Sequence, residues 1–162
     1  LPVVLTVDFD HDPRPPRACA DNAAVASAAA DHLLSLGLRS FGYYGNDIGP
    51  DDGLRWRGFR DAVAAGGHPC SRFSSELTWD ERRADERREA VAQWLLSLPK
   101  PAGVLGFNDI LGRYVVEAAR HAGIEVPDEL AVVGIDDDEV QCEYSNPPLS
   151  SIDTRRDRVG FE

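Results

Sequence analysis

Two short apolar runs, each followed at once by polar residues, constrain the fold of this chain most strongly. The first run, at residues 103–107, leads directly into Asn108 and Asp109. The second, at residues 131–135, leads into four acidic residues that begin with Asp136. Apolar runs of this length that end so abruptly are typical of strands buried on both faces of a parallel sheet. We therefore expect two central strands with polar residues at their carboxyl ends.

The rest of the chain alternates between helical and strand patterns. We expect strands at 2–7, 40–44, 71–73, 103–107 and 131–135, helices at 23–36, 53–65, 80–98 and 109–121, and a last extended segment at 149–152. Alternation of this kind implies right-handed crossovers and predicts an α/β fold with a doubly wound parallel sheet. Ligands of such sheets bind at the carboxyl ends of the strands. The edge that carries Asn108, Asp109 and Asp136 is therefore the candidate site.

Two proline-rich breaks divide the chain, one at residues 13–16 and one at 147–148. Proline fixes the backbone and removes a hydrogen-bond donor, so regular structure is not expected there. We expect residues 1–16 to be a strand with a crossover, 17–148 to be one compact lobe, and 149–162 to be a second crossover. Because the chain begins with Leu1 and contains no methionine, we expect it to be part of a longer protein.

Composition excludes several classes of protein. The 162 residues are 43% hydrophobic and 28% charged, as in a soluble globular domain, and no apolar run approaches the length of a membrane span. The net charge is -11 and Lys100 is the only lysine, so the chain is a poor nucleic-acid binder on its own. Three widely spaced cysteines without a Cys-x-x-Cys motif favour buried thiols in the cytoplasm over a disulfide or a metal site.

Asn108 and Asp109 have two readings that can coexist. Both residue types cap helices well, and a helical pattern begins at this point. Both would also lie at the sheet edge where a polar ligand binds. Asp136 could accept hydrogen bonds from two sugar hydroxyls, which are strong because the acceptor is charged. The alternative is that residues 136–139 form a solvated acidic loop, as most runs of charge do.

Arg55 and Trp79 are the remaining candidates for ligand contacts. Arg55 lies at the start of the helix expected at 53–65, which would direct it toward the same edge of the sheet. It could instead be an exposed arginine without a partner, and Arg57 fits the spacing equally well. Trp79 lies just before a helix cap, where an indole could stack on a sugar ring, although tryptophan is more often simply packed.

A rival hypothesis rests on Asp8 and Asp10. Phosphatases of the haloacid dehalogenase type use Asp-x-Asp after a strand as nucleophile and as acid/base, with a later acidic cluster for magnesium. Residues 136–139 could be that cluster and Lys100 the required lysine. The residue that usually follows the second aspartate is missing, so this signal is weak. The sequence contains no phosphate-binding Gly-x-x-x-x-Gly-Lys loop, no Gly-x-Gly-x-x-Gly loop and no Gly-x-Ser-x-Gly elbow.

Motifs along most of the chain resemble the sensing domain of LacI/GalR-family transcription regulators. The similar stretches are Leu1-Pro-Val-Val4, Asp21-Asn22, His32-Leu33-Leu34-x-x-Gly37, Phe41-Gly-Tyr-Tyr-Gly45, Arg55-x-x-Gly58-Phe59, Phe107-Asn108-Asp109, the stretch from Gly123 to Asp136, and Pro148-Leu-Ser-Ser-Ile152. The resemblance implies a flavodoxin-like lobe of a type I periplasmic-binding-protein fold. The stretches from Gly134 to Ser145 and from Asn146 to Ile152 are also similar to the xylose-responsive activators, in which this domain is fused to an AraC-type DNA-binding domain. Asp137 stands where that subgroup usually has asparagine, which leaves a pentose ligand open.

The resemblance implies a function without catalysis and without a cofactor or metal. By analogy with the family, Arg55, Asn108 and Asp136 would bind the sugar, Trp79 would stack on it, and Asp109 would be the acidic contact of the subgroup. The sugar would lie between two lobes, of which this chain holds mainly one. DNA would be bound through a domain absent from this chain, in a homodimer. A solute-binding protein of a sugar transporter is a further alternative, which would require export.

Overall fold

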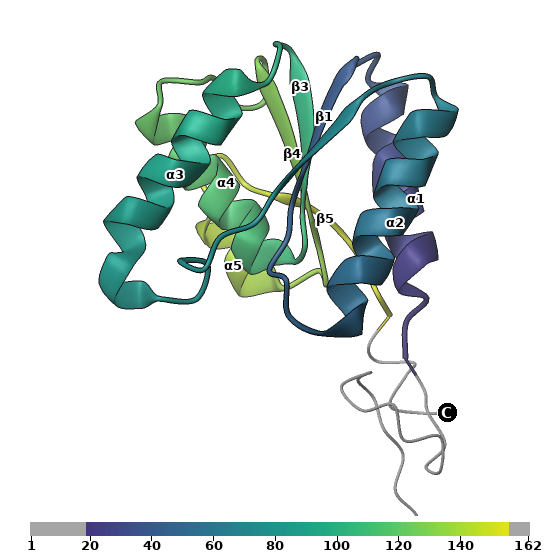
Figure 1. Cartoon of the computed structure of the whole chain (residues 1–162), viewed down its shortest axis with the longest axis horizontal. Coiled ribbons are helices and arrows are strands. Elements are labelled where there is room, and N and C mark those ends of the chain that lie inside the picture. The colour runs from purple at the N-terminus through teal and green to yellow at the C-terminus, as the bar shows by residue number, and fades with distance from the viewer. Residues whose placement is uncertain (1–18, 156–162) are drawn as a thin grey trace, which may run out of the picture.

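The computed structural model of the chain describes residues 19–155. A five-stranded, all-parallel sheet of order β2-β1-β3-β4-β5 lies between helices on both faces (Figure 1). This arrangement confirms the predicted fold class. The strands are β1 (Ser40–Tyr44), β2 (Cys70–Phe73), β3 (Ala102–Gly106), β4 (Leu130–Ile135) and β5 (Ser150–Ile152). The helices are α1 (Asn22–Ser35), α2 (Gly49–Ala65), the 3-10 turn η1 (Glu81–Arg83), α3 (Ala84–Ser97), α4 (Asp109–His121) and α5 (Glu139–Tyr144).

The core consists of two apolar layers, one on each face of the sheet. Successive side chains of a strand point to opposite faces, so neighbouring residues of β1 enter different layers. Tyr43 packs near Phe59 of α2, whereas Tyr44 packs near Phe73 and Trp94 on the other face. Both tyrosines are fully buried. Every residue of β1 is buried for this reason, which explains its continuous apolar and aromatic sequence.

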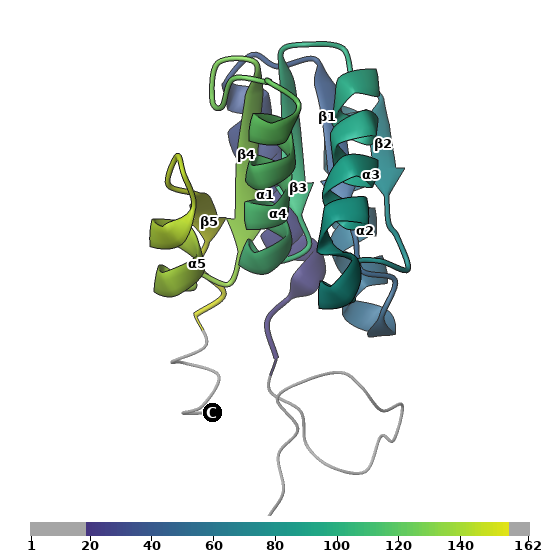
Figure 2. The same ribbon diagram turned by 90° about the vertical axis from the view of Figure 1, so that its left-hand side faces the viewer.

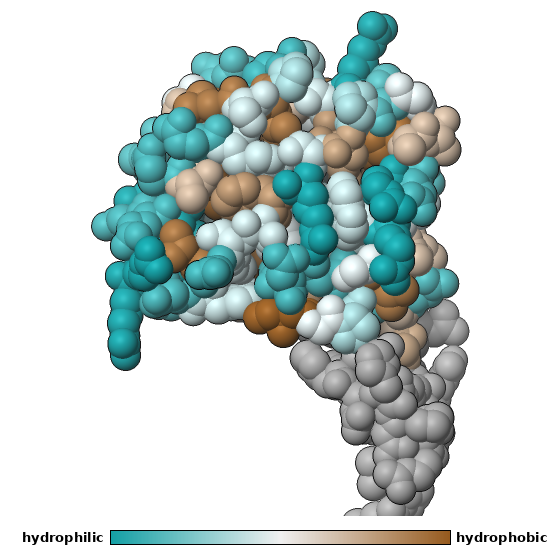
Figure 3. Space-filling view, viewed as in Figure 1, coloured by the Kyte–Doolittle hydropathy of each residue, from teal (hydrophilic) through white to brown (hydrophobic). Residues whose placement is uncertain are grey.

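Helices α1 and α2 cover one face, and α3 and α4 cover the other (Figure 1). Helices α1 and α2 approach closely because Gly58 has no side chain. A Cβ at this position would meet the backbone of Ala23. On the other face, Val91 and Leu95 of α3 point into the core, and hydrophilic side chains dominate the outer surface of that helix (Figure 3).

Three element boundaries differ from the sequence prediction. Helix α2 begins at Gly49 instead of residue 53, because Pro50 stands in its first turn, where the missing donor costs nothing. A 3-10 turn capped by Asp80 precedes α3, so the long charged helix is shorter than expected. The short helix α5 was not expected at all. The carboxylate of Asp138 accepts a hydrogen bond from the backbone N–H of Gln141 at 3.1 Å and so caps the start of α5.

The strand order places a topological switch point between β1 and β3. The chain continues from β1 outward to β2 and then returns to the other side of β1. Ligand sites of this sheet type lie outside the carboxyl ends at that switch point. Both ends of the described part, before α1 and after β5, also lie at this edge (Figures 1 and 2).

Some expectations concern residues that the structure does not describe. The strand at 2–7, the break at 13–16 and the end of the segment 149–162 lie outside residues 19–155. The proposed domain boundaries therefore stay predictions. Within the described part, no helix is both long and apolar enough to cross a membrane. The three cysteines are unpaired, and Cys19 is exposed, so the expectation of buried thiols is wrong for that residue.

Candidate functional site

The side chain of Arg55, on α2, joins the carboxyl ends of β3 and β4. Its Nε donates to Oδ1 of Asn22 at 2.7 Å, and its Nη1 donates to the carbonyl oxygen of Phe107 at 2.5 Å. Its Nη2 lies 3.4 Å from Oδ1 of Asp136, and the two charged side chains are 8% and 11% exposed. A guanidinium presents five donors in a rigid fork. One residue therefore fixes the start of α1 against two strand ends.

The structure distinguishes Arg55 from Arg57, which the sequence could not do. Arg55 is buried and contacts three elements, whereas Arg57 is exposed. The guanidinium carbon of Arg55 also lies 4.6 Å from the centroid of the Phe107 ring. A cation over an aromatic face is attracted to it, more strongly where water is excluded. Arg55 is thus held from two sides, and the reading of it as an exposed arginine without a partner is wrong.

Asp136 adopts a backbone conformation that is rare for a residue with a side chain. Its φ is 116°, and Asp137 follows with φ 54°. The strand ladder holds this turn, because the N–H of Asp136 donates to the carbonyl of Ile152 at 3.0 Å and the N–H of Asp137 donates to Oγ of Ser151 at 3.0 Å. Strained backbone of this kind concentrates at functional sites. Here the turn holds the carboxylate of Asp136 beside Arg55.

Asn108 caps α4, as one of its two readings predicted. Its Oδ1 accepts from the backbone N–H of Leu111 at 3.0 Å, and its own backbone is extended. The side-chain nitrogen has no hydrogen-bond partner among the described residues. Capping thus uses the side-chain oxygen of Asn108 and leaves its side-chain nitrogen as a donor at the carboxyl edge of the sheet.

Asp109 lies beneath the β4–α5 loop and is 1% exposed. Its Oδ2 accepts from the N–H of Asp138 at 2.7 Å, and its Oδ1 accepts from Oγ of Ser151 at 2.6 Å. Burial raises the pKa of this carboxyl, and the two hydrogen bonds partly oppose the rise. A Cβ on Gly134 would collide with the carboxylate. In this arrangement Asp109 supports the loop that begins at Asp136.

Trp79 lies on the loop after β2 and is 40% exposed. Among the described residues, no other ring stacks on it. Its neighbour Thr78 anchors the loop, because Oγ1 of Thr78 lies 3.3 Å from the hydroxyl of Tyr44 and its carbonyl accepts from Arg87 at 3.3 Å. Because β2 and β4 are separated by β1 and β3, Trp79 and Asp136 come from opposite parts of the carboxyl edge.

Three residues of this network were not found by sequence reasoning as parts of the site. Asn22 accepts from Arg55 and donates from Nδ2 to Asp51 at 2.9 Å. Phe107 supplies its carbonyl and ring to Arg55. Ser151 links Asp109 to Asp137. Asn22 left one signal in the sequence: Asp21 already supplies the cap of α1, so a second capping-type residue was free for another role.

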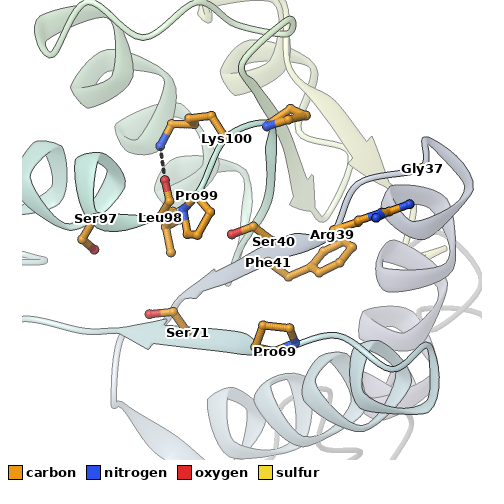
Figure 4. A pocket seen from close by; sticks show the side chains of 11 residues that line it. Gly37, Arg39, Ser40, Phe41, Pro69, Ser71, Ser97, Leu98, Pro99 and Lys100 are labelled. Carbon is orange, nitrogen blue, oxygen red and sulfur yellow. Dashed lines mark hydrogen bonds between the residues drawn. The ribbon is translucent and has the colours of Figure 1, made fainter.

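A cavity of about 500 Å³ lies at the opposite edge of the sheet, where β1 and β3 begin (Figure 4). Prolines at 69, 99 and 101 form much of its wall. The ammonium of Lys100 turns toward the carbonyl oxygens of Leu95 and Leu98, at 2.5 and 2.9 Å, where it satisfies the end of α3. Burial lowers the pKa of Lys100. This cavity is distinct from the site predicted at the carboxyl edge.

Asp8 and Asp10, on which the phosphatase hypothesis rests, lie outside the described residues. The acidic run that would complete that site is described. Asp136 contacts Arg55, Asp138 caps α5, and Glu139 is the first residue of that helix. The run is therefore a strand exit followed by a helix cap, and the reading of it as a solvated loop is wrong for Asp136.

The chain is similar to known transcription regulators along most of its length. The Xylose operon regulatory protein of Haemophilus influenzae is 28% identical over 156 residues, which cover 94% of this chain and 40% of that protein. The HTH-type transcriptional regulator GntR of Pseudomonas aeruginosa is 32% identical over 161 residues, which cover 99% of this chain and 46% of that protein. The solved structure of the xylose-binding transcription activator xylR has a TM-score of 0.83 at 26% identity, with 98% of this chain and 43% of that chain covered.

The chain thus spans less than half the length of these relatives. A family model described as the periplasmic binding protein-like domain matches residues 30–162, which include every strand of the sheet and all five predicted site residues. The expected relation to LacI/GalR-type regulators is confirmed at this level, whereas the xylose-responsive subgroup and its AraC-type fusion stay predictions. The chain belongs to the periplasmic binding protein-like domain family.

Proposed function

We propose that this chain is the sugar-sensing lobe of a cytoplasmic transcription regulator and has no catalytic role. One observation carries the proposal: Arg55 and Asp136 form a nearly covered charged pair at the switch-point edge of the sheet. A guanidinium donates and a carboxylate accepts, so together they suit vicinal hydroxyls, which both accept and donate. Charge-assisted hydrogen bonds are about twice as strong as neutral ones.

The other predicted residues fit the same ligand chemistry. Asn108 offers an amide donor next to the exit of β3, beyond its cap. Trp79 offers a half-exposed indole, suited to the apolar face of a sugar ring. Asp109 acts on the ligand through Asp136, because its carboxylate holds the loop from below.

The ligand we propose is a pentose, with xylose as the first candidate. Support comes from the xylose regulators among the relatives, together with the motifs that begin at Gly134. Asp137 departs from the xylose-responsive pattern. Its carboxylate could select among pentoses that differ in one hydroxyl, because a charged acceptor forms a stronger hydrogen bond with a hydroxyl than a neutral acceptor does.

Sensing requires two states of the protein. A sugar held between this lobe and a facing lobe would favour a closed arrangement. The shift in free energy between the open and closed states equals the difference between the sugar's binding free energies for the two states. The closed arrangement would change the affinity of a DNA-binding domain for its operator. We further propose that the working protein is a homodimer, since most soluble oligomers have twofold symmetry and a symmetric dimer matches a palindromic operator.

Calorimetric titration of the natural full-length protein tests this function. D-xylose, L-arabinose, D-ribose and D-glucose would be compared, together with the Arg55→Ala and Asp136→Ala variants. We expect one pentose to bind best and both substitutions to weaken it at least about tenfold, while the exposed Arg57→Ala control binds normally. Normal sugar binding by both site variants would refute the residue assignment. No binding of any sugar, with phosphatase turnover that is lost in Asp8→Asn, would refute the function.

A further inference from the structure

The proline-lined cavity at the amino edge of the sheet, bounded by prolines at 69, 99 and 101, has the dimensions of a small-molecule site. Its volume of about 500 Å³ lies within the usual range for such sites. None of the residues that line it belongs to the network of Arg55 and Asp136 at the carboxyl edge. A ligand bound in this cavity would therefore be distinct from the proposed sugar.

The segments that lead into three neighbouring strands form the walls of the cavity. Pro69 precedes β2, Ser40 is the first residue of β1, and Pro99 and Pro101 lie between α3 and β3. A proline ring fixes its own φ, so walls of this kind lose little conformational freedom when a ligand binds. The proline rings and the neighbouring Leu98 are apolar, which favours a ligand that buries apolar surface.

Ser40 contributes a buried hydroxyl that is free to bind a ligand. The residue is 8% exposed, and its hydroxyl has no hydrogen-bond partner among residues 19–155. Figure 4 shows this hydroxyl directed into the cavity, toward the side on which Pro99 and Ser71 lie. Most buried hydroxyls find a partner, because an unsatisfied one is costly. A polar ligand atom in the cavity would supply that partner.

Ser71 of β2 adds a second hydroxyl on the same face of the sheet. It pairs in register with Gly42, which lies two residues after Ser40, so both serine side chains point to the face that α3 covers. Oγ of Ser71 accepts from Nε1 of Trp94 at 3.0 Å, and its own proton has no acceptor in the described part of the chain. Two neighbouring strands therefore each offer a hydroxyl to a largely apolar cavity.

The charges around the cavity favour an uncharged ligand. Arg39 and Lys100 are its cationic residues, and none of the described residues that line it is acidic. The ammonium of Lys100 already donates to two carbonyl oxygens at the end of α3. Figure 4 shows Arg39 extending away from the hydroxyl of Ser40. No positive charge therefore faces the hydroxyl to which a ligand would bind.

We propose that the proline-lined cavity binds a small uncharged aromatic molecule that carries a hydroxyl group, so that the lobe has a second ligand site. Proline rings pack well against aromatic rings, as they do when proline-rich peptides bind to aromatic-lined grooves. The hydroxyl of the ligand both donates and accepts, as does that of Ser40. A sugar fits this cavity poorly, because most of its hydroxyls would lose water against apolar walls without gaining a partner.

Titration of the natural full-length protein with phenol, followed by ligand-observed NMR, tests the site. Toluene is the probe without a hydroxyl, and benzoate is the charged probe. Ser40→Ala removes the hydroxyl from the cavity, whereas Ser40→Leu extends an apolar side chain into it. Ser145→Ala is the matched control: Ser145 is 4% exposed and its hydroxyl also lacks a partner among the described residues, but it does not line this cavity.

We expect phenol to bind to the wild type more tightly than toluene or benzoate. Ser40→Ala should weaken phenol binding about threefold to tenfold, as for one lost hydrogen bond, and should leave toluene binding unchanged. Ser40→Leu should abolish the binding of both, and Ser145→Ala should bind as the wild type does. The melting temperature of Ser40→Ala without ligand should not fall, because the hydroxyl that it removes has no partner within residues 19–155.

Three outcomes would overturn the proposal. The first is that phenol does not bind to the wild type. The second is that Ser40→Ala binds phenol as tightly as the wild type does, since the hydroxyl would then make no contact with the ligand. The third is that benzoate binds more tightly than phenol, which would assign the cavity to an anion instead.

Discussion

The guanidinium of Arg55 and the backbone of Phe107 are in direct contact, with Nη1 2.5 Å from the carbonyl oxygen. The same guanidinium lies over the ring of Phe107, 4.6 Å from its centroid. Phe107 directly follows β3 and its N–H donates to the carbonyl of Tyr44 at 2.9 Å, so this contact ties α2 to the switch point between β1 and β3. Through Asn22 the same arginine reaches the start of α1. A ligand that binds Arg55 would therefore act on three elements at once.

Removal of the Arg55 side chain should destabilise the protein as well as abolish sugar binding. Arg55→Ala takes the charged partner from Asp136 and a donor from the carbonyl of Phe107. We expect the free energy of unfolding in urea to fall by about 3 kcal/mol, because loss of one member of a covered ion pair is costly. Arg57→Ala on the same helix should change it by less than about 0.5 kcal/mol. Equal effects of the two substitutions would contradict the role of Arg55 as the link among these elements.

Gly134→Ala tests the close contact between β4 and α4. A Cβ at this position would collide with the carboxylate of Asp109, which is itself held by Ser151 and Asp138. We expect a loss of about 2 kcal/mol in the free energy of unfolding, as in other overpacked cores. Gly53→Ala is the control, because only the flexible end of Arg57 lies near that position. That variant should be about 0.5 kcal/mol more stable than the wild type, since glycine weakens a helix.

The titration of Asp109 gives a pH dependence with a definite sign. Burial raises the pKa of this carboxyl in the folded protein above its ordinary value. The folded state therefore binds the proton more tightly than the unfolded state, and ionisation of Asp109 lowers stability as the pH rises. This loss of stability occurs over the pH range between the ordinary pKa of the carboxyl and its raised pKa in the folded protein.

Urea unfolding of the wild type and Asp109→Asn from about pH 4 to pH 8 measures this effect. The stability of the wild type relative to the variant should be greatest at the acidic end and should decrease as the pH rises through the raised pKa. A relative stability that increases with pH would show that hydrogen bonds from Ser151 and Asp138 outweigh burial.

Trp79 and Trp94 should respond oppositely to substitution by phenylalanine. Trp79 is 40% exposed, so Trp79→Phe should change the free energy of unfolding by less than about 0.5 kcal/mol and should weaken sugar binding severalfold. Trp94 is 9% exposed and its Nε1 donates to Ser71 at 3.0 Å. Trp94→Phe should cost about 1–2 kcal/mol and leave sugar binding intact. Unchanged affinity in Trp79→Phe would remove Trp79 from the sugar site.

The fold was predictable because its signals are local. Apolar runs such as those of β3 and β4 end abruptly at polar residues, and a helical pattern separates β3 from β4. Alternation of this kind admits few topologies. The short helix α5 escaped prediction, because its six residues contain no buried side chain and hence no apolar periodicity.

The sequence by itself determined the α/β sheet and the edge at which polar residues gather, since both follow from the order of apolar and polar residues along the chain. Only the tertiary structure decided between Arg55 and Arg57, because residues two positions apart on a helix point about 200° apart and packing selects which one faces the sheet. The tertiary structure likewise decided that the side chain of Asp109 lies beneath the β4–α5 loop and that the side chain of Asp136 contacts Arg55, although both residues follow strands. Those orientations depend on Ser151 and Asn22, which are distant in sequence, and no local pattern encodes such contacts.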